Sequence, residues 1–126
     1  PAGALFKIMT RINCGIPPAE LTDKHLLAEH REIKRIPNCV AKGRFNMANQ
    51  PKKFTLGKGH VKFFYDKLEY LLIRYHQLYD ECIKRGFNVE NYSQAWFGIP
   101  KSYFGNYTPT DADREIVRQR IKERLK

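Results

Sequence analysis

The strongest pattern of hydrophobic and polar positions lies in the middle of the chain. Apolar side chains recur there at spacings of three and four residues, at Val61, Phe64, Leu68, Leu71, Tyr75, Leu78 and Cys82. This period places them on one face of an α-helix. Gly86 directly follows Arg85, and a glycine at such a point is typical of a helix end. The pattern therefore predicts one long helix packed against the core.

A second helix is predicted upstream of this one. It follows Pro17 and Pro18, and Thr22 or Asp23 can cap its first turn. It runs toward Pro37, which we expect to end or kink it, because proline lacks the N–H that an interior helical position donates.

A third helix is predicted to begin at Thr108 and Pro109, a capping residue followed by proline at the first helical position. Its expected buried positions are Ala112, Ile116, Val117, Ile121 and Leu125. Loops are expected over 41–53, rich in Asn, Gly, Lys and Pro, and over the aromatic stretch 87–107. We expect the aromatic side chains of the second loop to close the core, at Trp96, Phe97, Tyr103, Phe104 and Tyr107.

These elements define the expected fold class. A chain of 126 residues favours one hydrophobic core over two. No segment shows the polar and apolar alternation that predicts a strand. We therefore expect an all-α protein, a single compact domain of three main packed helices with long loops.

Charge narrows the class of partner. The chain has 23 Lys and Arg against 13 Asp and Glu, a formal net charge of +10. Such a balance favours a polyanion, and nucleic acid is the leading candidate because phosphate neutralisation releases counterions. An acidic membrane surface competes, but the basic residues are spread over several segments instead of one amphipathic helix. Nucleic acid is therefore the expected partner.

Other features exclude several classes of protein. No stretch approaches the roughly 20 apolar residues of a membrane span, and the first residues lack the apolar length of a secretory signal, so we expect a soluble, intracellular protein without membrane contact. Cys14, Cys39 and Cys82 lack CxxC spacing, and His60 and His76 lack ligand spacing. We therefore expect reduced thiols and no metal site.

One helix face carries candidate chemistry. At about 100° per residue, one arc holds His25, Ala28, Arg31, Glu32 and Arg35. Leu26 and Ile33 point elsewhere, toward a core, and the small Ala28 leaves the arc open to a ligand. On pattern alone, exposed ion pairs worth tenths of a kcal/mol explain this arc better than a catalytic site does.

Five segments change that balance when they are considered together. They are MTRIN (9–13), HLLAEHREIKR (25–35), TLGKGHVKFFYDKLEYL (55–71), ECIKRGFNV (81–89) and GIPKSYFGNYTP (98–109). In this order they resemble the pyrimidine-dimer DNA glycosylase/AP lyases of the phage and viral endonuclease V type. The resemblance covers residues 9–126, which we expect to form the glycosylase and lyase domain, with residues 1–8 as an N-terminal extension.

The resemblance implies an all-helical enzyme with two activities. It would cleave the glycosidic bond of a cyclobutane pyrimidine dimer and then nick the abasic site by β-elimination. Its partner would be double-stranded DNA that contains pyrimidine dimers or abasic sites. It would need no cofactor and no metal, act as a monomer, and work in the cytoplasm or nucleoid, or inside the host cell if the protein is viral.

The resemblance also assigns roles to residues. Thr10, exposed as the N-terminus by removal of Met9, would supply its α-amine as nucleophile, and Glu32 would be the catalytic carboxylate. An α-amine has an ordinary pKa of about 7.7 to 8.0, so a useful fraction is neutral at pH 7. The basic neighbours of Glu32 favour its ionised form. The residues expected to contact DNA are Arg11, Lys24, His25, Arg31, Arg35, Arg120 and Arg124.

The chain departs from the family pattern in ways that keep alternatives open. Lys24 stands where the family has a glutamine, and His30 where it has a tyrosine. Pro1 to Ile8 precede Met9 and would leave the nitrogen of Thr10 in an amide, so we interpret them as a cloning or start-site artefact. The alternatives are a basic DNA-binding module without catalysis, and a lyase or glycosylase acting mainly on abasic or oxidised lesions. Substitution of Glu32 separates the first from an enzyme.

Overall fold

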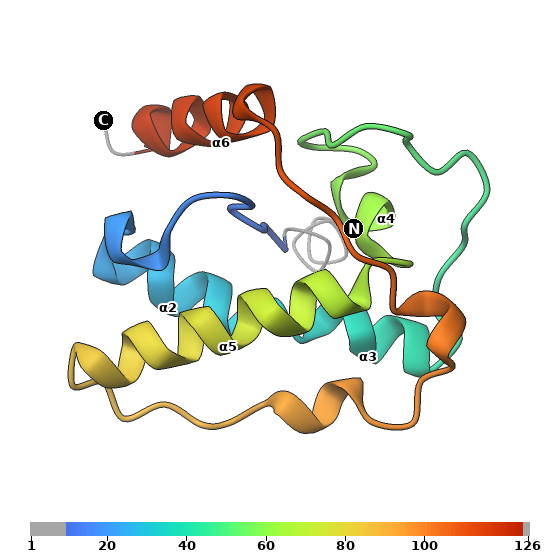
Figure 1. Ribbon diagram of the computed structural model, residues 1–126, viewed down its shortest axis with the longest axis horizontal. Helices are drawn as coiled ribbons and strands as arrows, with labels where there is room; N and C mark the ends of the chain where they lie inside the picture. The colour runs from blue at the N-terminus through green and yellow to red at the C-terminus, as the bar shows by residue number, and fades with distance from the viewer. Residues whose placement is uncertain (1–9, 125–126) are drawn as a thin grey trace, which may run out of the picture.

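The computed structural model describes residues 10–124, and this part of the chain is helical (Figure 1). The α-helices are α2 (Asp23–Glu32), α3 (Arg35–Ala41), α4 (His60–Phe64), α5 (Leu68–Lys84) and α6 (Asp111–Arg124). The 3-10 turns are η1 (Pro18–Glu20), η2 (Ser93–Trp96) and η3 (Lys101–Tyr103). Within 10–124 the β-structure is limited to an isolated antiparallel bridge between Lys67 and Phe104. The all-α prediction is confirmed.

The helix predicted between Pro18 and Pro37 is two helices in the structure. Thr22 caps α2 as predicted, since its Oγ1 accepts the N–H of His25 at 3.2 Å. The helix ends at Glu32, however, and the chain restarts as α3 at Arg35. Pro37 is the third residue of α3, where its missing N–H would have no partner inside the helix. The predicted end or kink near Pro37 is therefore present as a break at Ile33 and Lys34, ahead of the proline, and Arg35 belongs to a different helix from Glu32.

The long helix predicted over 61–82 is also interrupted, between α4 and α5. At the interruption, the N–H of Gly105 donates to the carbonyl of Asp66 at 2.9 Å. A Cβ at Gly105 would lie 2.4 Å from that carbonyl oxygen, so the close approach requires glycine. The predicted single helix is wrong because a loop distant in the sequence bonds to its backbone. The predicted end is confirmed, since Gly86 has φ 84° and its N–H bonds to the carbonyl of Ile83.

The third predicted helix begins later than expected, at Asp111. Thr110 and Asp113 form a reciprocal cap, in which Thr110 Oγ1 accepts the N–H of Asp113 at 3.0 Å and Asp113 Oδ2 accepts the N–H of Thr110 at 3.1 Å. The predicted start at Thr108 and Pro109 is therefore wrong. Of the predicted buried positions, Val117 is buried and Ile121 half-buried, Ala112 and Ile116 are exposed, and Leu125 lies outside the described residues.

The core is built around α5, which packs against α2. Its fully buried side chains are Leu68, Leu71, Tyr75, Leu78 and Cys82. In the aromatic loop Trp96 is buried as predicted, and Tyr103, Phe104 and Tyr107 are half-buried against the core. Phe97 is 73% exposed, so the prediction that it closes the core is wrong. Figure 1 shows the segment after residue 10, in blue, running between α2 and α6.

Three further findings bear on the predicted class. Cys14, Cys39 and Cys82 are free thiols, as predicted. Among residues 10–124, no helix is long and apolar enough to cross a membrane. The predicted extension, residues 1–8, and Met9 lie outside the described residues.

Candidate functional site

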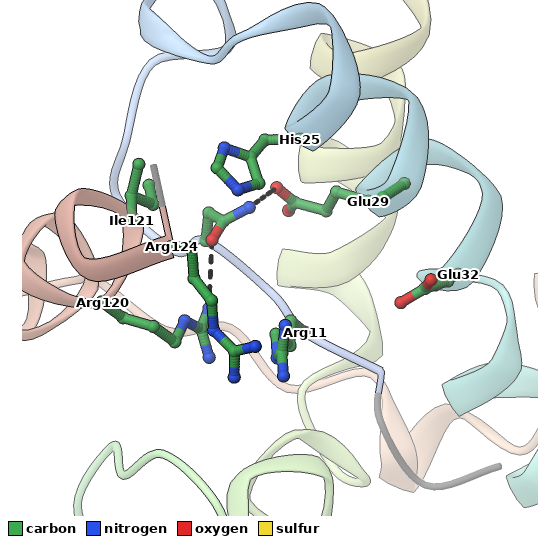
Figure 2. A pocket seen from close by; sticks show the side chains of 9 residues that line it. Arg11, His25, Glu29, Glu32, Arg120, Ile121 and Arg124 are labelled. Atoms are coloured by element: carbon green, nitrogen blue, oxygen red, sulfur yellow. Dashed lines mark hydrogen bonds between the residues drawn. The ribbon is translucent and has the colours of Figure 1, made fainter. Parts of the chain in front are cut away.

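A pocket of about 250 Å³ opens where the N-terminal segment passes between α2 and α6 (Figure 2). We call it the arginine pocket; it is lined by Arg11, Asn13, His25, Ala28, Glu29, Glu32, Arg120, Ile121 and Arg124. Three segments distant in the sequence contribute these side chains. The predicted arc is confirmed for His25, Ala28 and Glu32, which face the pocket from α2.

Three guanidinium groups converge in the arginine pocket. Figure 2 shows Arg120 and Arg124 reaching from α6 toward Arg11 of the N-terminal segment. Burial and the charge of Arg124 lower the pKa of Arg11, and Glu32 opposes this effect. Burial, followed by the charge of Arg11, lowers the pKa of Arg120 to about 10, so it remains cationic at neutral pH. Like charges this close favour an anion between them.

His25 lies in the same field. Burial lowers its pKa, and the charges of Lys24 and Arg120 lower it further, so the imidazole is neutral at pH 7. Its Nδ1 lies 3.2 Å from Thr22 Oγ1, the capping hydroxyl of α2. The ring therefore lines the pocket as an uncharged hydrogen-bonding group.

Glu29 is buried at the back of the pocket and is fully engaged. Its Oε2 accepts from Arg74 Nε at 2.8 Å and its Oε1 from Arg74 Nη2 at 2.9 Å, with the two side chains 1% and 3% exposed. Asn13 Nδ2 donates to the same Oε1 at 2.9 Å. A buried carboxylate is stable only with such partners, so Glu29 is a structural anion.

Asn13 joins this buried pair to the arginine cluster. Its amide nitrogen donates to Glu29, and its amide oxygen accepts from Arg120 Nη2 at 3.0 Å. The link runs from α5 through α2 and the N-terminal segment to α6, from Arg74 to Arg120. Sequence reasoning missed Asn13, Glu29 and Arg74 as site residues, because none shares a sequence spacing with its partners.

Glu32, unlike Glu29, is a partly exposed carboxylate. It is the last residue of α2, and its side chain is 19% exposed. Its contact with Arg31 is long, 3.5 Å, and the Arg31 side chain is exposed. Figure 2 shows Glu32 on the side of the pocket away from His25 and facing the region of Arg11. Glu32 therefore keeps oxygen atoms available to a ligand.

The structure brings together some predicted site residues and separates others. Arg11, His25, Glu32, Arg120 and Arg124 line the arginine pocket. Arg31 and Lys24 are exposed and lie outside its lining. Arg35 is exposed on α3 and lines a different pocket, together with Thr10.

We call this second pocket, of about 200 Å³, the Thr10 pocket. It is lined by Thr10, Arg35, Ile36, Cys39, Gly57, Lys58, Gly59, Val61, Lys62 and Tyr65. Thr10 is 4% exposed. Two short stretches of chain connect the two pockets. Thr10 directly precedes Arg11, and the α2–α3 turn joins Glu32 to Arg35. Gly57 and Gly59 both have positive φ and shape the turn before α4.

His60, the first residue of α4, also contacts the N-terminal segment. Its Nε2 accepts the backbone N–H of Ile12 at 2.9 Å, and its Nδ1 lies 2.8 Å from the carbonyl oxygen of Thr55. Burial lowers its pKa to about 4. Both ring nitrogens are therefore engaged with backbone atoms. Among residues 10–124, no group of three His, Cys, Asp or Glu side chains could hold a metal ion.

A comparison with known families places this geometry in context. The family described as pyrimidine dimer DNA glycosylase matches residues 9–94. The match spans Thr10, Arg11, His25 and Glu32, and it ends before α6, which supplies Arg120 and Arg124. It covers more than half of the 126 residues. The chain therefore belongs to the pyrimidine dimer DNA glycosylase family, and it is a DNA repair glycosylase whose substrate is DNA.

Proposed function

We propose that this glycosylase cleaves the glycosidic bond of one pyrimidine of a cyclobutane dimer and then nicks the strand at the abasic site, with the α-amine of Thr10 as nucleophile. The observation that carries the proposal is the arginine pocket, in which Glu32 faces three arginines, one of them adjacent to Thr10 in the chain. The site combines a carboxylate for proton transfer with cations for phosphate.

The chemistry balances without a further reactant. The neutral amine attacks C1′ of the sugar and then loses a proton. The glycosidic C–N bond breaks, and the base keeps its electron pair, takes up a proton and stays joined to its neighbour through the cyclobutane ring. Opening of the sugar ring breaks the C1′–O4′ bond, protonates O4′ and yields an imine. The imine acidifies the C2′ proton, whose removal expels the 3′ phosphate by β-elimination, and water then releases the enzyme.

Glu32 is the carboxylate that takes part in these steps. As an anion it stabilises the cationic sugar that develops when the base leaves, and it transfers protons while the imine forms and eliminates. Glu29 is unsuited to this role, because Arg74 and Asn13 already occupy both of its oxygens.

The arginines hold the DNA backbone near the reacting sugar. Arg11, Arg120 and Arg124 converge on one pocket and would bind a phosphate, with His25 as a neutral donor or acceptor beside them. Arg31, Arg35 and Lys24 are exposed around it and would contact phosphates further along the duplex. One chain supplies every one of these groups, which supports a monomer as the active form. The active domain is residues 9–126, shortened by the removal of Met9.

The decisive experiment compares the chain that begins at Thr10 with the chain that keeps residues 1–9. Each is incubated with borohydride and one dimer-containing and one abasic duplex. The chain that begins at Thr10 should form a covalent adduct with both duplexes, located on Thr10 by peptide mapping. The longer chain should bind DNA and form little adduct, because an amide nitrogen is not a nucleophile.

A matched control places one glycine before Thr10. This variant keeps a free α-amine and displaces it by about 3.8 Å, the distance between consecutive Cα atoms. It should form adduct much more slowly than the chain that begins at Thr10. Equal trapping by all three chains, with the adduct on an internal lysine, would replace the amine mechanism by a lysine-based one. Trapping on the abasic duplex alone would indicate an abasic-site lyase, and no trapping would indicate a DNA-binding module.

A further inference from the structure

The N-terminal segment must be held in place by something other than regular secondary structure. Residues 10–13 belong to no helix or strand, yet Ile12 is fully buried and its N–H needs a partner. That partner is the imidazole of His60, 48 residues away in the chain, at 2.9 Å. The segment that carries Thr10 is thus tied to the start of α4 by a side chain.

The two hydrogen bonds of His60 define its tautomer. Because Nε2 accepts the N–H of Ile12, the ring proton resides on Nδ1, which donates to the carbonyl of Thr55. The bond from Ile12 requires an unprotonated Nε2 and therefore the neutral ring, and burial keeps the ring neutral by lowering its pKa. The imidazole therefore bridges the backbone of the loop before α4 and the backbone of the N-terminal segment.

Packing alone does not explain a histidine at this position. His60 is buried, and the rings of Phe54 and Phe64 lie with their centroids 5.4 Å from its own. An aromatic side chain without nitrogens would fill the same space without the cost of burying polar atoms. The nitrogens are therefore of use only to the two backbone groups that they bind.

We propose that His60 is a positioning residue for the amine of Thr10, a role that rests on the proposed function. The amide nitrogen of Ile12 lies two residues beyond the reacting nitrogen, so fixing it limits the range of positions open to Thr10. Asn13, bonded to Glu29, fixes the next residue in the same way. A nucleophile must approach its carbon within about 3 to 3.5 Å, and a displacement of about 1 Å costs on the order of 100-fold in rate.

Two substitutions of His60 each keep one of its two hydrogen bonds and remove the other. His60→Gln places an amide oxygen where Nε2 lies and keeps an acceptor for Ile12. His60→Asn mimics Nδ1, keeps a donor for Thr55 and leaves the N–H of Ile12 unpaired. The measurement is the rate of borohydride trapping on an abasic duplex at saturating enzyme, with the chain that begins at Thr10. We expect the rate to fall by about 10- to 100-fold for His60→Asn and to stay closer to wild type for His60→Gln.

A direct test removes the donor and leaves His60 intact. Cys14 allows a synthetic segment of residues 10–13 to be ligated to the rest of the chain. Replacing the amide nitrogen of Ile12 by an ester oxygen deletes the N–H, and the same ligation with the natural amide is the control. The ester should slow trapping as His60→Asn does, and the two changes combined should slow it little more than either alone. If His60→Asn does not fold, the ester variant alone tests whether the bond between Ile12 and His60 positions Thr10.

Tyr75 provides a matched structural control. The N–H of Tyr92, also in a loop, donates to the hydroxyl of Tyr75 on α5 at 2.6 Å. Tyr75→Phe deletes this bond, together with the longer contacts of the hydroxyl to His30 Nε2 at 3.4 Å and Asn91 Oδ1 at 3.5 Å. We expect it to lower the melting temperature and leave the trapping rate unchanged. Binding of each variant to a tetrahydrofuran abasic analogue, which cannot form an imine, should equal that of wild type.

The outcomes separate this inference from the function on which it rests. If wild type does not trap on Thr10, the proposed function fails and the role of His60 fails with it. If wild type traps and the ester traps at the same rate, the function stands and the positioning role is overturned. An equal loss of rate in Tyr75→Phe and the ester would assign the effect to general stability and would also overturn it.

Discussion

The arginine pocket has a buried side and an open side, and each has a carboxylate from α2. Glu29 is 1% exposed and accepts three hydrogen bonds from Arg74 and Asn13, whereas Glu32 is 19% exposed with a single 3.5 Å contact to Arg31. The two residues lie about one helical turn apart, and Arg31 is close to both in the sequence. Their environments therefore assign them different roles, since a saturated buried carboxylate supports the fold and an accessible one can transfer protons.

The buried side also organises the open side. Asn13 hydrogen-bonds both Glu29 and Arg120, so the buried Glu29–Arg74 pair fixes the position of the Arg120 guanidinium. This bond holds Arg120 in place against repulsion from Arg11 and Arg124. A cluster of cations held in this way is preorganised for an anion, because the cost of gathering the charges is met in folding. Four predictions test this division of roles.

Glu32→Gln tests the open side. Removing the charge should slow base release by about 100-fold or more, within the range of acid–base catalysis by one group. Binding to damaged DNA should be equal or tighter, since one repulsion with phosphate disappears, and the free energy of unfolding should change by less than about 0.5 kcal/mol. Single-turnover base release and denaturant unfolding measure the two effects. Full glycosylase activity in this variant would show that Glu32 is an exposed charged residue without a catalytic role.

Glu29→Gln tests the buried side and should show the opposite pattern. It leaves Arg74 without its counter-ion, which costs about 3 to 5 kcal/mol of unfolding free energy for a buried pair. Denaturant unfolding gives this value. Adding Arg74→Met should restore much of the loss, because the unpaired charge is removed. A stability loss below about 1 kcal/mol, or a specific loss of base release in a well-folded variant, would contradict the structural role.

Burial of His60 should make the stability of the fold sensitive to acid. Its pKa is about 4 in the folded protein against an ordinary value of 6.5, so the unfolded chain binds more protons between these pH values and stability falls as the pH drops through this window. The difference corresponds to at most about 3 kcal/mol. His60→Gln should lose that part of the dependence, while His25 and His30 still titrate. Denaturant unfolding from pH 7 to pH 4 makes the comparison, and parallel curves would contradict the assignment.

Arg120→Ala and Arg124→Ala test the phosphate cluster and have the smallest expected effects. Each should reduce the slope of log affinity against log salt by about 0.9, the value for one phosphate contact. Arg118→Ala is the control on the same helix, because Arg118 lies outside the pocket and pairs with Glu20 at 3.2 Å. A larger effect from Arg118 than from Arg120 would move the DNA contact to the outer face of α6.

Much of the fold was predictable because helices depend on local signals. Spacings of three and four residues identified α5, Thr22 identified the start of α2, and Gly86 the end of α5. The resemblance pointed to Thr10, Arg11 and Glu32 before any geometry was known, and the arc on α2 placed His25 beside Glu32. Each of these signals lies within a few residues of the feature that it predicts.

Two failures of sequence reasoning occurred where distant segments meet. The contact between Gly105 and Asp66 interrupts the helix predicted over 61–82, and no periodicity within that segment could have indicated the contact. Glu29 and Glu32 look alike in the sequence, and only the packing of α2 on α5 places Arg74 against one of them.

The helical class and the basic character can be read from the chain alone, because short-range periodicity and composition encode them, and the five segments carry the family resemblance. Tertiary structure alone decided which carboxylate is accessible, which cations converge and how the segment after Thr10 is held. The bonds that decide these points join residues 16, 48 and 107 positions apart. The physical reason is that a buried polar group takes whichever partner the packed core brings to it, and that partner has no fixed spacing in the chain.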